Sequence, residues 1–153
     1  MKETLLEMLV CPLCLPKEIA LKALITQERE GDITEGTLSC PGCGGAYPIR
    51  EGIAFLDPSP PAPAGAASKY ETAPVVSSYL WSHFGDIMGD PEASSAYADW
   101  AALVSSGPGA VLDIGCAVGR FVFETSSSHD FAVGIDNSVA FIRAARELMI
   151  QGS

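Results

Sequence analysis

The first third of the chain has short apolar runs that are typical of strands. Residues 19–28 mix apolar–polar alternation with β-branched residues and predict a strand, and further short strands are predicted at 36–39 and 46–56, where Gly52 interrupts the last one. Residues 3–9 show the spacing of one short helix. The pattern predicts a small, β-rich unit.

The last third has five-residue apolar runs that alternate with helical segments. The cluster Gly107-Pro108-Gly109 predicts a turn in front of the first run. The order of strand and helix is that of the start of a parallel α/β sheet. The expected elements are strand 110–114, helix 118–127, strand 131–135 and helix 138–149, with further helices at 74–84 and 92–105.

The segment between these two parts cannot form a core. Residues 58–68 contain four prolines, no charged side chain and no large apolar one. Such a composition favours extended polyproline conformation. We therefore expect a semi-rigid linker at 58–68 between one domain at 1–57 and another at 69–153.

Composition excludes several classes of partner. The 153 residues carry a net charge of −10, which disfavours binding to nucleic-acid phosphates and docking on anionic membranes. No apolar run is long enough to span a membrane, and Glu3 and Glu7 interrupt the N-terminal apolar stretch, which does not resemble a secretory signal. We expect a cytoplasmic location, no membrane partner and no preference for nucleic acid.

Four of the five cysteines form two pairs, each with two intervening residues. Cys11 and Cys14 make the first pair and Cys40 and Cys43 the second, with 25 residues between the pairs. Two such turns can present four thiolates to one tetrahedral Zn²⁺, which would be structural because no coordination position stays open. Two disulfides, or a redox-active Cys-x-x-Cys, are the alternatives.

The same segment resembles a known family. The stretches LLEMLVCPLC and LSCPGCGGAYPIREGIAFL, within residues 3–57, are similar to the small zinc-ribbon activator subunit of tRNA and release-factor methyltransferases. The resemblance implies a domain that docks on a methyltransferase and stabilises it. Here we expect it to pack on such a domain of its own chain, in cis.

The strand at 110–114 ends in a loop of small residues. Asp113 and Gly115 lie at its carboxyl end, Gly119 follows, and the next strand ends in Asp136. Glycines there permit a ligand to approach the backbone, and an acid after the second strand can accept hydrogen bonds from ribose hydroxyls. Arg120 stands where a dinucleotide fingerprint needs Gly or Ala, which favours a cationic, phosphate-free nucleoside. The alternative is an ordinary strand–turn–helix segment, in which the small residues serve the turn and bind no ligand.

These residues resemble the first two motifs of class I S-adenosylmethionine-dependent methyltransferases, over about residues 107–149. The resemblance implies that Asp113 orients the methionine amino group and that Asp136 binds the ribose hydroxyls. Ala117 departs from the glycine that this family most often has. The residues implied to line the methionine and ribose part of the cofactor are Gly115, Cys116, Ala117 and Gly119.

Together these features predict an enzyme: the N-terminal portion of an S-adenosylmethionine-dependent methyltransferase with its own zinc ribbon. Its fold class would be α/β, with a Rossmann-like sheet that continues beyond this chain, and its acceptor a small molecule or protein. Because the remaining strands are absent, the resemblance names no catalytic residue. The alternatives are a non-catalytic zinc-ribbon module that stabilises a methyltransferase partner, and an RNA methyltransferase whose RNA-binding surface lies in the missing part.

Three further residues have expected roles that are structural. Cys116 is expected to be a small buried apolar residue rather than a nucleophile. His83, in the aromatic-rich segment 79–84, is expected to pack in the core beside Tyr79, and contact with a cofactor or substrate is the alternative. Arg120 is expected on a solvated helix face.

Overall fold

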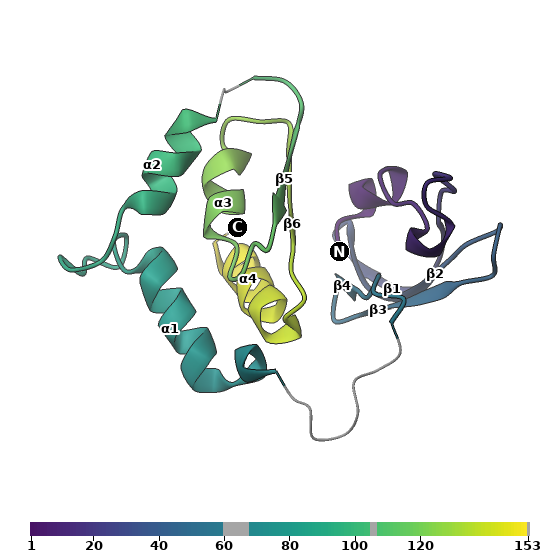
Figure 1. Ribbon diagram of the computed structural model, residues 1–153, viewed down its shortest axis with the longest axis horizontal. Coiled ribbons are helices and arrows are strands. Elements are labelled where there is room, and N and C mark those ends of the chain that lie inside the picture. Colours follow the sequence, from purple (N-terminus) through teal and green to yellow (C-terminus); the bar gives the residue numbers. More distant parts are fainter. Residues whose placement is uncertain (60–67, 105–106, 153) are drawn as a thin grey trace. The chain divides into compact units, whose positions relative to one another are not determined.

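A computed structural model describes residues 1–59, 68–104 and 107–152 of the chain. The chain divides into two compact units, Met1–Ala62 (unit 1) and Pro63–Ser153 (unit 2), which are treated separately below (Figure 1). Most of the predicted linker, residues 60–67, lies outside the described residues.

Unit 1 is built on a four-stranded antiparallel sheet in the order β1-β2-β3-β4 (Figure 1). The prediction of a small β-rich unit is confirmed, and Gly52, with φ of +74°, lies in the turn that separates β3 from β4. The expected N-terminal helix is a single short 3-10 helix. The elements are η1 (Glu3–Glu7), η2 (Pro12–Cys14), β1 (Lys22–Arg29), β2 (Asp32–Ser39), β3 (Ala46–Arg50) and β4 (Ile53–Ala54).

The core of unit 1 follows from the two-residue period of its strands. In β3, Tyr47 and Ile49 are buried whereas Ala46 and Arg50 are exposed, because successive side chains point to opposite faces. Few large apolar side chains join them; the buried ones with the least exposed area are Ile33, Leu38 and Ile49. A unit of this size buries too little apolar surface to be comfortably stable by packing alone. A bound metal would therefore matter to its folding.

Unit 2 contains a parallel pair of strands joined by a helix. β5 and β6 pair in register from Ala110 opposite Phe131 to Ile114 opposite Ile135, which confirms the expected strand–helix–strand–helix order. The elements are η3 (Lys69–Glu71), α1 (Ala73–Phe84), α2 (Ala96–Leu103), β5 (Ala110–Ile114), α3 (Arg120–Ser126), β6 (Phe131–Ile135) and α4 (Val139–Gln151).

Helices cover unit 2 unevenly. α3 packs on both strands, α2 on α3, and α1 on α4 (Figure 1). Successive side chains of a strand point to opposite faces, and the face of the pair that α3 does not cover is exposed. On this face Leu112 and Ile114 of β5 are 57 % and 77 % exposed, and Ile135 of β6 is 45 % exposed. No helix in the described ranges is long and apolar enough to cross a membrane.

The N-terminus of α4 is capped by residues from two parts of unit 2. Ser138 is the N-cap residue and accepts a hydrogen bond from the Phe141 amide at 3.2 Å. The Glu71 carboxylate accepts further bonds from the Val139 and Ala140 amides, each at 3.0 Å. This negative charge at a helix N-terminus is favourable, and it fixes η3 against the start of α4.

Candidate metal centre and ligand cavity

The four paired cysteines converge in unit 1. Their Sγ atoms all lie within 4.8 Å of one another, with Cys11–Cys43 at 3.6 Å and Cys14–Cys40 at 3.7 Å. Zinc–sulfur bonds of about 2.3 Å in a tetrahedron place sulfur atoms about 3.8 Å apart, so the spacing fits Zn²⁺. All four thiols are free, and the sulfurs are too far apart for the two disulfides considered from the sequence.

Backbone amides shape the second cysteine turn around its sulfur atoms. The Gly42 amide donates to Cys40 Sγ and the Gly45 amide to Cys43 Sγ, both at 3.4 Å. The Tyr47 hydroxyl lies 3.3 Å from Cys11 Sγ, where it can orient that ligand from outside the cluster. The donor set is therefore held in place by groups that stabilise sulfur ligands.

The thiols of the cluster differ in proton affinity. Burial raises the pKa of Cys11, but hydrogen bonds from Tyr47 and the neighbouring thiols outweigh it and lower that pKa to about 6. Contact with Cys43, together with burial, raises the pKa of Cys14 to about 12. Since zinc binds thiolates, zinc binding would release protons from the cluster. Four cysteine ligands leave no position for substrate, so the metal would be structural.

The glycine-rich loop after β5 contains residues in the left-handed backbone conformation. Gly115 and Gly119 both have φ of +84°, a conformation that favours glycine, and Ala117 has φ of +46°. The Gly115 and Cys116 amides donate to the Ile135 carbonyl at 2.8 and 3.0 Å. The loop is thus fixed to the carboxyl end of β6.

Asp136 has a structural role in this loop. Its Oδ2 accepts a hydrogen bond from the Ala117 amide at 2.9 Å, and its Oδ1 accepts one from the Ser138 amide at 2.8 Å. Both carboxylate oxygens are therefore engaged within the chain. Hydrogen bonds from ribose hydroxyls would have to share or replace these bonds.

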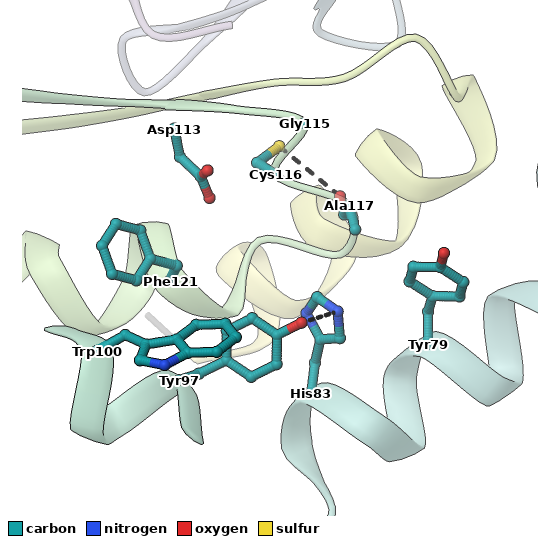
Figure 2. A pocket seen from close by; sticks show the side chains of 9 residues that line it. All are labelled: Tyr79, His83, Tyr97, Trp100, Asp113, Gly115, Cys116, Ala117 and Phe121. Carbon is teal, nitrogen blue, oxygen red and sulfur yellow. Dashed lines mark hydrogen bonds between the residues drawn. The ribbon is translucent and has the colours of Figure 1, made fainter. Parts of the chain in front are cut away.

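A cavity of about 420 Å³ lies beside the loop. Four of the six predicted cofactor residues line it, namely Asp113, Gly115, Cys116 and Ala117, whereas Gly119 and Asp136 are not among its lining residues. Figure 2 shows this segment on one side of the cavity and aromatic side chains on the other. The aromatic lining residues are Tyr79, His83, Tyr97, Trp100 and Phe121.

Asp113 is the acidic group of the cavity. Burial raises the pKa of its carboxyl above the ordinary value, and the nearby charge of Asp136 raises it further. Within the described part of the chain, no hydrogen-bond donor is recorded on its carboxylate. A cation in the cavity would stabilise the charged form of this side chain.

His83 is buried, as the sequence predicts, but it also lines the cavity. Its Nε2 and the Tyr97 hydroxyl form a hydrogen bond of 2.6 Å, and its Nδ1 has no partner among the described residues. Burial, with a smaller effect of the Arg120 charge, lowers the pKa of His83 to about 4. The imidazole is therefore neutral at pH 7.

The sequence predicted Arg120 on a solvated helix face, and this prediction is wrong. It is 3 % exposed, and its guanidinium donates to both Asp86 oxygens at 2.6 and 2.9 Å and to the His83 carbonyl at 2.6 Å. Nε donates to Glu124 at 2.7 Å. The arginine connects α3 to the end of α1, a tertiary contact that helical periodicity cannot show.

Cys116 behaves as the buried apolar residue that the sequence predicts. It is 5 % exposed, and burial raises the pKa of its thiol to about 12. A thiol with this pKa is a poor nucleophile at neutral pH.

Most of the aromatic side of the cavity was not predicted as a site. Contact of His83 with a ligand was the less favoured alternative, and nothing in the sequence gave Tyr97 or Trp100 a role. A weak signal exists, since Tyr79 and His83, four residues apart, share one face of α1, as Tyr97 and Trp100, three apart, share one face of α2. Nothing in the sequence indicates that these two faces meet.

Comparison with known proteins supports one of the two resemblances. Residues 2–52 match the family model of the Trm112p-like protein. A solved structure, the complex between the Haloferax volcanii Trm112 methyltransferase activator and a methyltransferase, matches at 34 % identity over 38 % of this chain and 93 % of that chain, with a TM-score of 0.35. No curated protein matches.

These findings correct the prediction that the chain is an enzyme. The family model that matches residues 2–52 is that of the Trm112p-like protein, and this match gives no support to a fused methyltransferase domain. It favours the alternative considered from the sequence, a non-catalytic zinc-ribbon module, over the predicted enzyme. The predicted zinc-ribbon resemblance is supported; the predicted fusion to a methyltransferase is not.

Proposed function

We propose that unit 1 is a zinc-stabilised, non-catalytic module that binds a methyltransferase in trans and stabilises it. The match of residues 2–52 to the Trm112p-like family carries this proposal. The four-cysteine cluster supports it, because a metal bound there would cross-link a unit whose core is too small to make it stable by packing alone. The activator and the methyltransferase of the similar complex are distinct components, which favours a partner in trans over the packing in cis expected from the sequence.

Exposed apolar side chains of unit 1 are consistent with a docking surface. Leu13 and Leu15, on either side of Cys14, are 59 % and 58 % exposed, and Leu24 on β1 is 69 % exposed. Exposure of large apolar side chains to water is unfavourable, and their burial by a partner protein would lower the free energy of the complex. We place the docking contact at Leu13 and Leu15.

Affinity capture with the zinc-loaded full chain, in the cell of origin, tests this proposal. We expect an S-adenosylmethionine-dependent methyltransferase to be enriched, and the Leu13→Asp/Leu15→Asp double variant to lose it. Leu103→Asp is the matched control, since Leu103 is 83 % exposed but belongs to unit 2. The purified methyltransferase should then gain thermal stability with the wild-type chain and not with the double variant.

Two results would contradict the proposal. One is the absence of any methyltransferase among the captured proteins. The other is a methyltransferase whose thermal stability is the same with and without the wild-type chain.

We also propose a second candidate function, in which unit 2 is a Rossmann-like portion that binds S-adenosylmethionine without catalysis. The observation that favours it is the cavity beside the β5–α3 loop, which four of the six predicted residues line. Asp113 would face the cationic part of the cofactor. Asp136 would reach the ribose by sharing or giving up its hydrogen bonds to the Ala117 and Ser138 amides.

Calorimetry of the full chain with S-adenosylmethionine tests this second candidate. We expect saturable binding that Asp136→Ala weakens by about tenfold, as for the loss of a charge-assisted hydrogen bond. Asp130→Ala is the control, because Asp130 bonds the Gly109 amide at the opposite end of the strands. No binding by the wild-type chain would refute the candidate.

A further inference from the structure

The connection between α1 and α2 exposes large apolar side chains to water. Trp81, in the last turn of α1, is 51 % exposed, and Ile87 and Met88 in the following turn are 68 % and 67 % exposed. In Figure 1 this connection projects away from the β5–β6 pair. None of the three side chains lines the cavity beside the β5–α3 loop, so they belong to a separate surface.

Two of these side chains share one face of the helix and of the turn that extends it. The Gly85 amide donates to the Trp81 carbonyl at 2.8 Å, and the Met88 amide donates to the Phe84 carbonyl at 3.1 Å, so the helical bonding pattern continues past the end of α1. Residues seven apart lie on the same side of a helix, and Trp81 and Met88 therefore face the same way. Ile87 adjoins Met88 in the turn. We call Trp81, Ile87 and Met88 the apolar patch.

The chain that follows this turn folds back on α1 and fixes the tryptophan. The Trp81 indole donates to Asp90 Oδ2 at 2.7 Å, and Asp90 Oδ1 accepts from the Glu92 amide at 2.9 Å. A Cβ at Gly85 would lie 2.7 Å from the Ala93 Cβ, so the glycine lets the loop approach the helix this closely. The orientation of an exposed tryptophan is thus set before a partner binds, which lowers the entropy cost of binding.

The segment around the apolar patch is acidic. Hydrogen bonds from the Trp81 indole and the Glu92 amide lower the pKa of Asp90, which is therefore charged at neutral pH. Arg120 neutralises Asp86, whereas no ion pair is recorded for Asp90 or Glu92 within the described residues. These two carboxylates form a rim that attracts basic groups and repels phosphates. Residues 70–119 contain no lysine or arginine and six acidic side chains, namely Glu71, Asp86, Asp90, Glu92, Asp99 and Asp113.

We propose that the apolar patch, with Asp90 and Glu92 as its rim, binds a basic amphipathic segment of a partner protein. Apolar side chains of that segment cover Trp81 and Met88, and its lysines or arginines pair with the rim. Tryptophan and methionine are enriched in protein–protein interfaces, and tryptophan is frequent among the residues that supply most of the binding free energy.

The charge of the rim selects this class of partner. A nucleic acid or an anionic membrane would bring phosphates against Asp90 and Glu92, whereas a basic protein segment supplies the opposite charge together with apolar side chains. A second copy of the chain would bring the same net charge of −10 against this one. The proposal depends neither on the role of unit 1 nor on a ligand in the cavity of unit 2.

Nuclear magnetic resonance of the indole groups tests the proposal in the zinc-loaded full chain. The chain has two tryptophans, and Trp100→Phe assigns their signals. The probes are a synthetic amphipathic helix of leucine and lysine and a second peptide with glutamate at every lysine position. We expect the leucine–lysine peptide to shift the Trp81 signal and leave the Trp100 signal in place, and the leucine–glutamate peptide to shift neither.

Met88→Asp separates contact with the patch from general attraction between opposite charges. The substitution removes an apolar contact and adds a charge that attracts the leucine–lysine peptide, and we expect binding about tenfold weaker than for the wild type. Leu103→Asp makes the same kind of change at a residue that is 83 % exposed on α2, and it should not weaken binding. Glu92→Gln should weaken binding about threefold, as for the loss of one exposed ion pair. The Trp100 signal reports an intact fold in each variant.

Three results would overturn the proposal. One is equal affinity of Met88→Asp and Leu103→Asp for the leucine–lysine peptide, because net charge alone would then explain the binding. Another is a Trp81 signal that neither peptide moves. The third is a shift of the Trp81 signal by duplex RNA or by phosphatidylserine vesicles at lower concentrations than by the peptide, which would assign the patch to one of those partners.

Discussion

At the scale of single residues, Cys40 and Cys116 are both buried but differ in what surrounds their sulfur atoms. Cys40 Sγ lies 3.7 Å from Cys14 Sγ within the cluster, whereas Cys116 packs beneath the loop after β5, and Gly134 leaves room for its sulfur. A Cβ at position 134 would lie 2.7 Å from that sulfur, which is closer than packing allows. Burial alone therefore does not distinguish a metal ligand from a packed thiol.

Cys40→Ser should abolish zinc binding and destabilise unit 1. We expect one zinc per wild-type chain by elemental analysis, none that survives dialysis in the variant, and a loss of more than about 3 kcal/mol in the free energy of unfolding of unit 1. Cys116→Ser is the control and should retain the metal. Equal zinc content in the two variants would disprove the four-cysteine site.

His83 should make the stability of unit 2 depend on pH. Its pKa falls from 6.5 in the unfolded chain to about 4 in the folded one, mainly through burial. Between these values the unfolded state binds more protons, so the free energy of unfolding must decrease as the pH falls from about 7 to 4. We expect a decrease of roughly 1–2 kcal/mol between pH 7 and pH 5.

Urea unfolding followed by tryptophan fluorescence measures this effect, because both tryptophans belong to unit 2. His83→Gln should flatten the dependence between pH 7 and pH 5. A slope that survives His83→Gln would assign it to other groups.

At the scale of elements, Arg120 connects α3 to the end of α1. Arg120→Ala would leave the His83 carbonyl and the Asp86 carboxylate without their donor, and we expect a loss of roughly 3 kcal/mol in the stability of unit 2. Glu124→Gln is the control: it removes only the charge of the partly exposed i,i+4 partner and should cost less than about 1 kcal/mol. Urea unfolding by tryptophan fluorescence compares the two, and equal losses would contradict this role.

Local patterns predicted most of the elements and much of both candidate sites. Cysteine spacing was sufficient for the cluster, since each pair lies in one turn and only two turns have to meet. The strand end at Asp113 and the glycines after it were likewise readable, because parallel strands bring their carboxyl ends together. These features depend on residues close together in the sequence.

Features that depend on distant packing were not predicted. Tyr97 and Trp100 reach the cavity only because α2 lies against α3, and Arg120 is buried only because α1 ends beside it. The assignment of Asp136 to ribose stays a prediction, and the hydrogen bonds that its carboxylate accepts from the Ala117 and Ser138 amides were not predicted. A sequence motif identifies the carboxylate as a hydrogen-bond acceptor, but it does not identify the donors that the fold brings to it.

At the scale of the whole molecule, all four candidate zinc ligands belong to unit 1 and both tryptophans to unit 2. Removal of the metal with a chelator should therefore unfold the β-sheet of unit 1, seen by circular dichroism, and leave the urea midpoint reported by tryptophan unchanged. Added zinc should restore the sheet. A tryptophan midpoint that falls on chelation would show that the stability of unit 2 depends on the metal.

The bare apolar face of the β5–β6 pair also affects how the protein behaves at high concentration. The exposed side chains of Leu112, Ile114 and Ile135 form an apolar surface through which two molecules can associate. The net charge of −10 opposes this association, because the molecules repel one another. Sodium chloride screens that repulsion, and ammonium sulfate strengthens apolar contact. Colloidal stability should thus be greatest in dilute buffer, with turbidity appearing as salt is added, at lower concentrations of sulfate than of chloride.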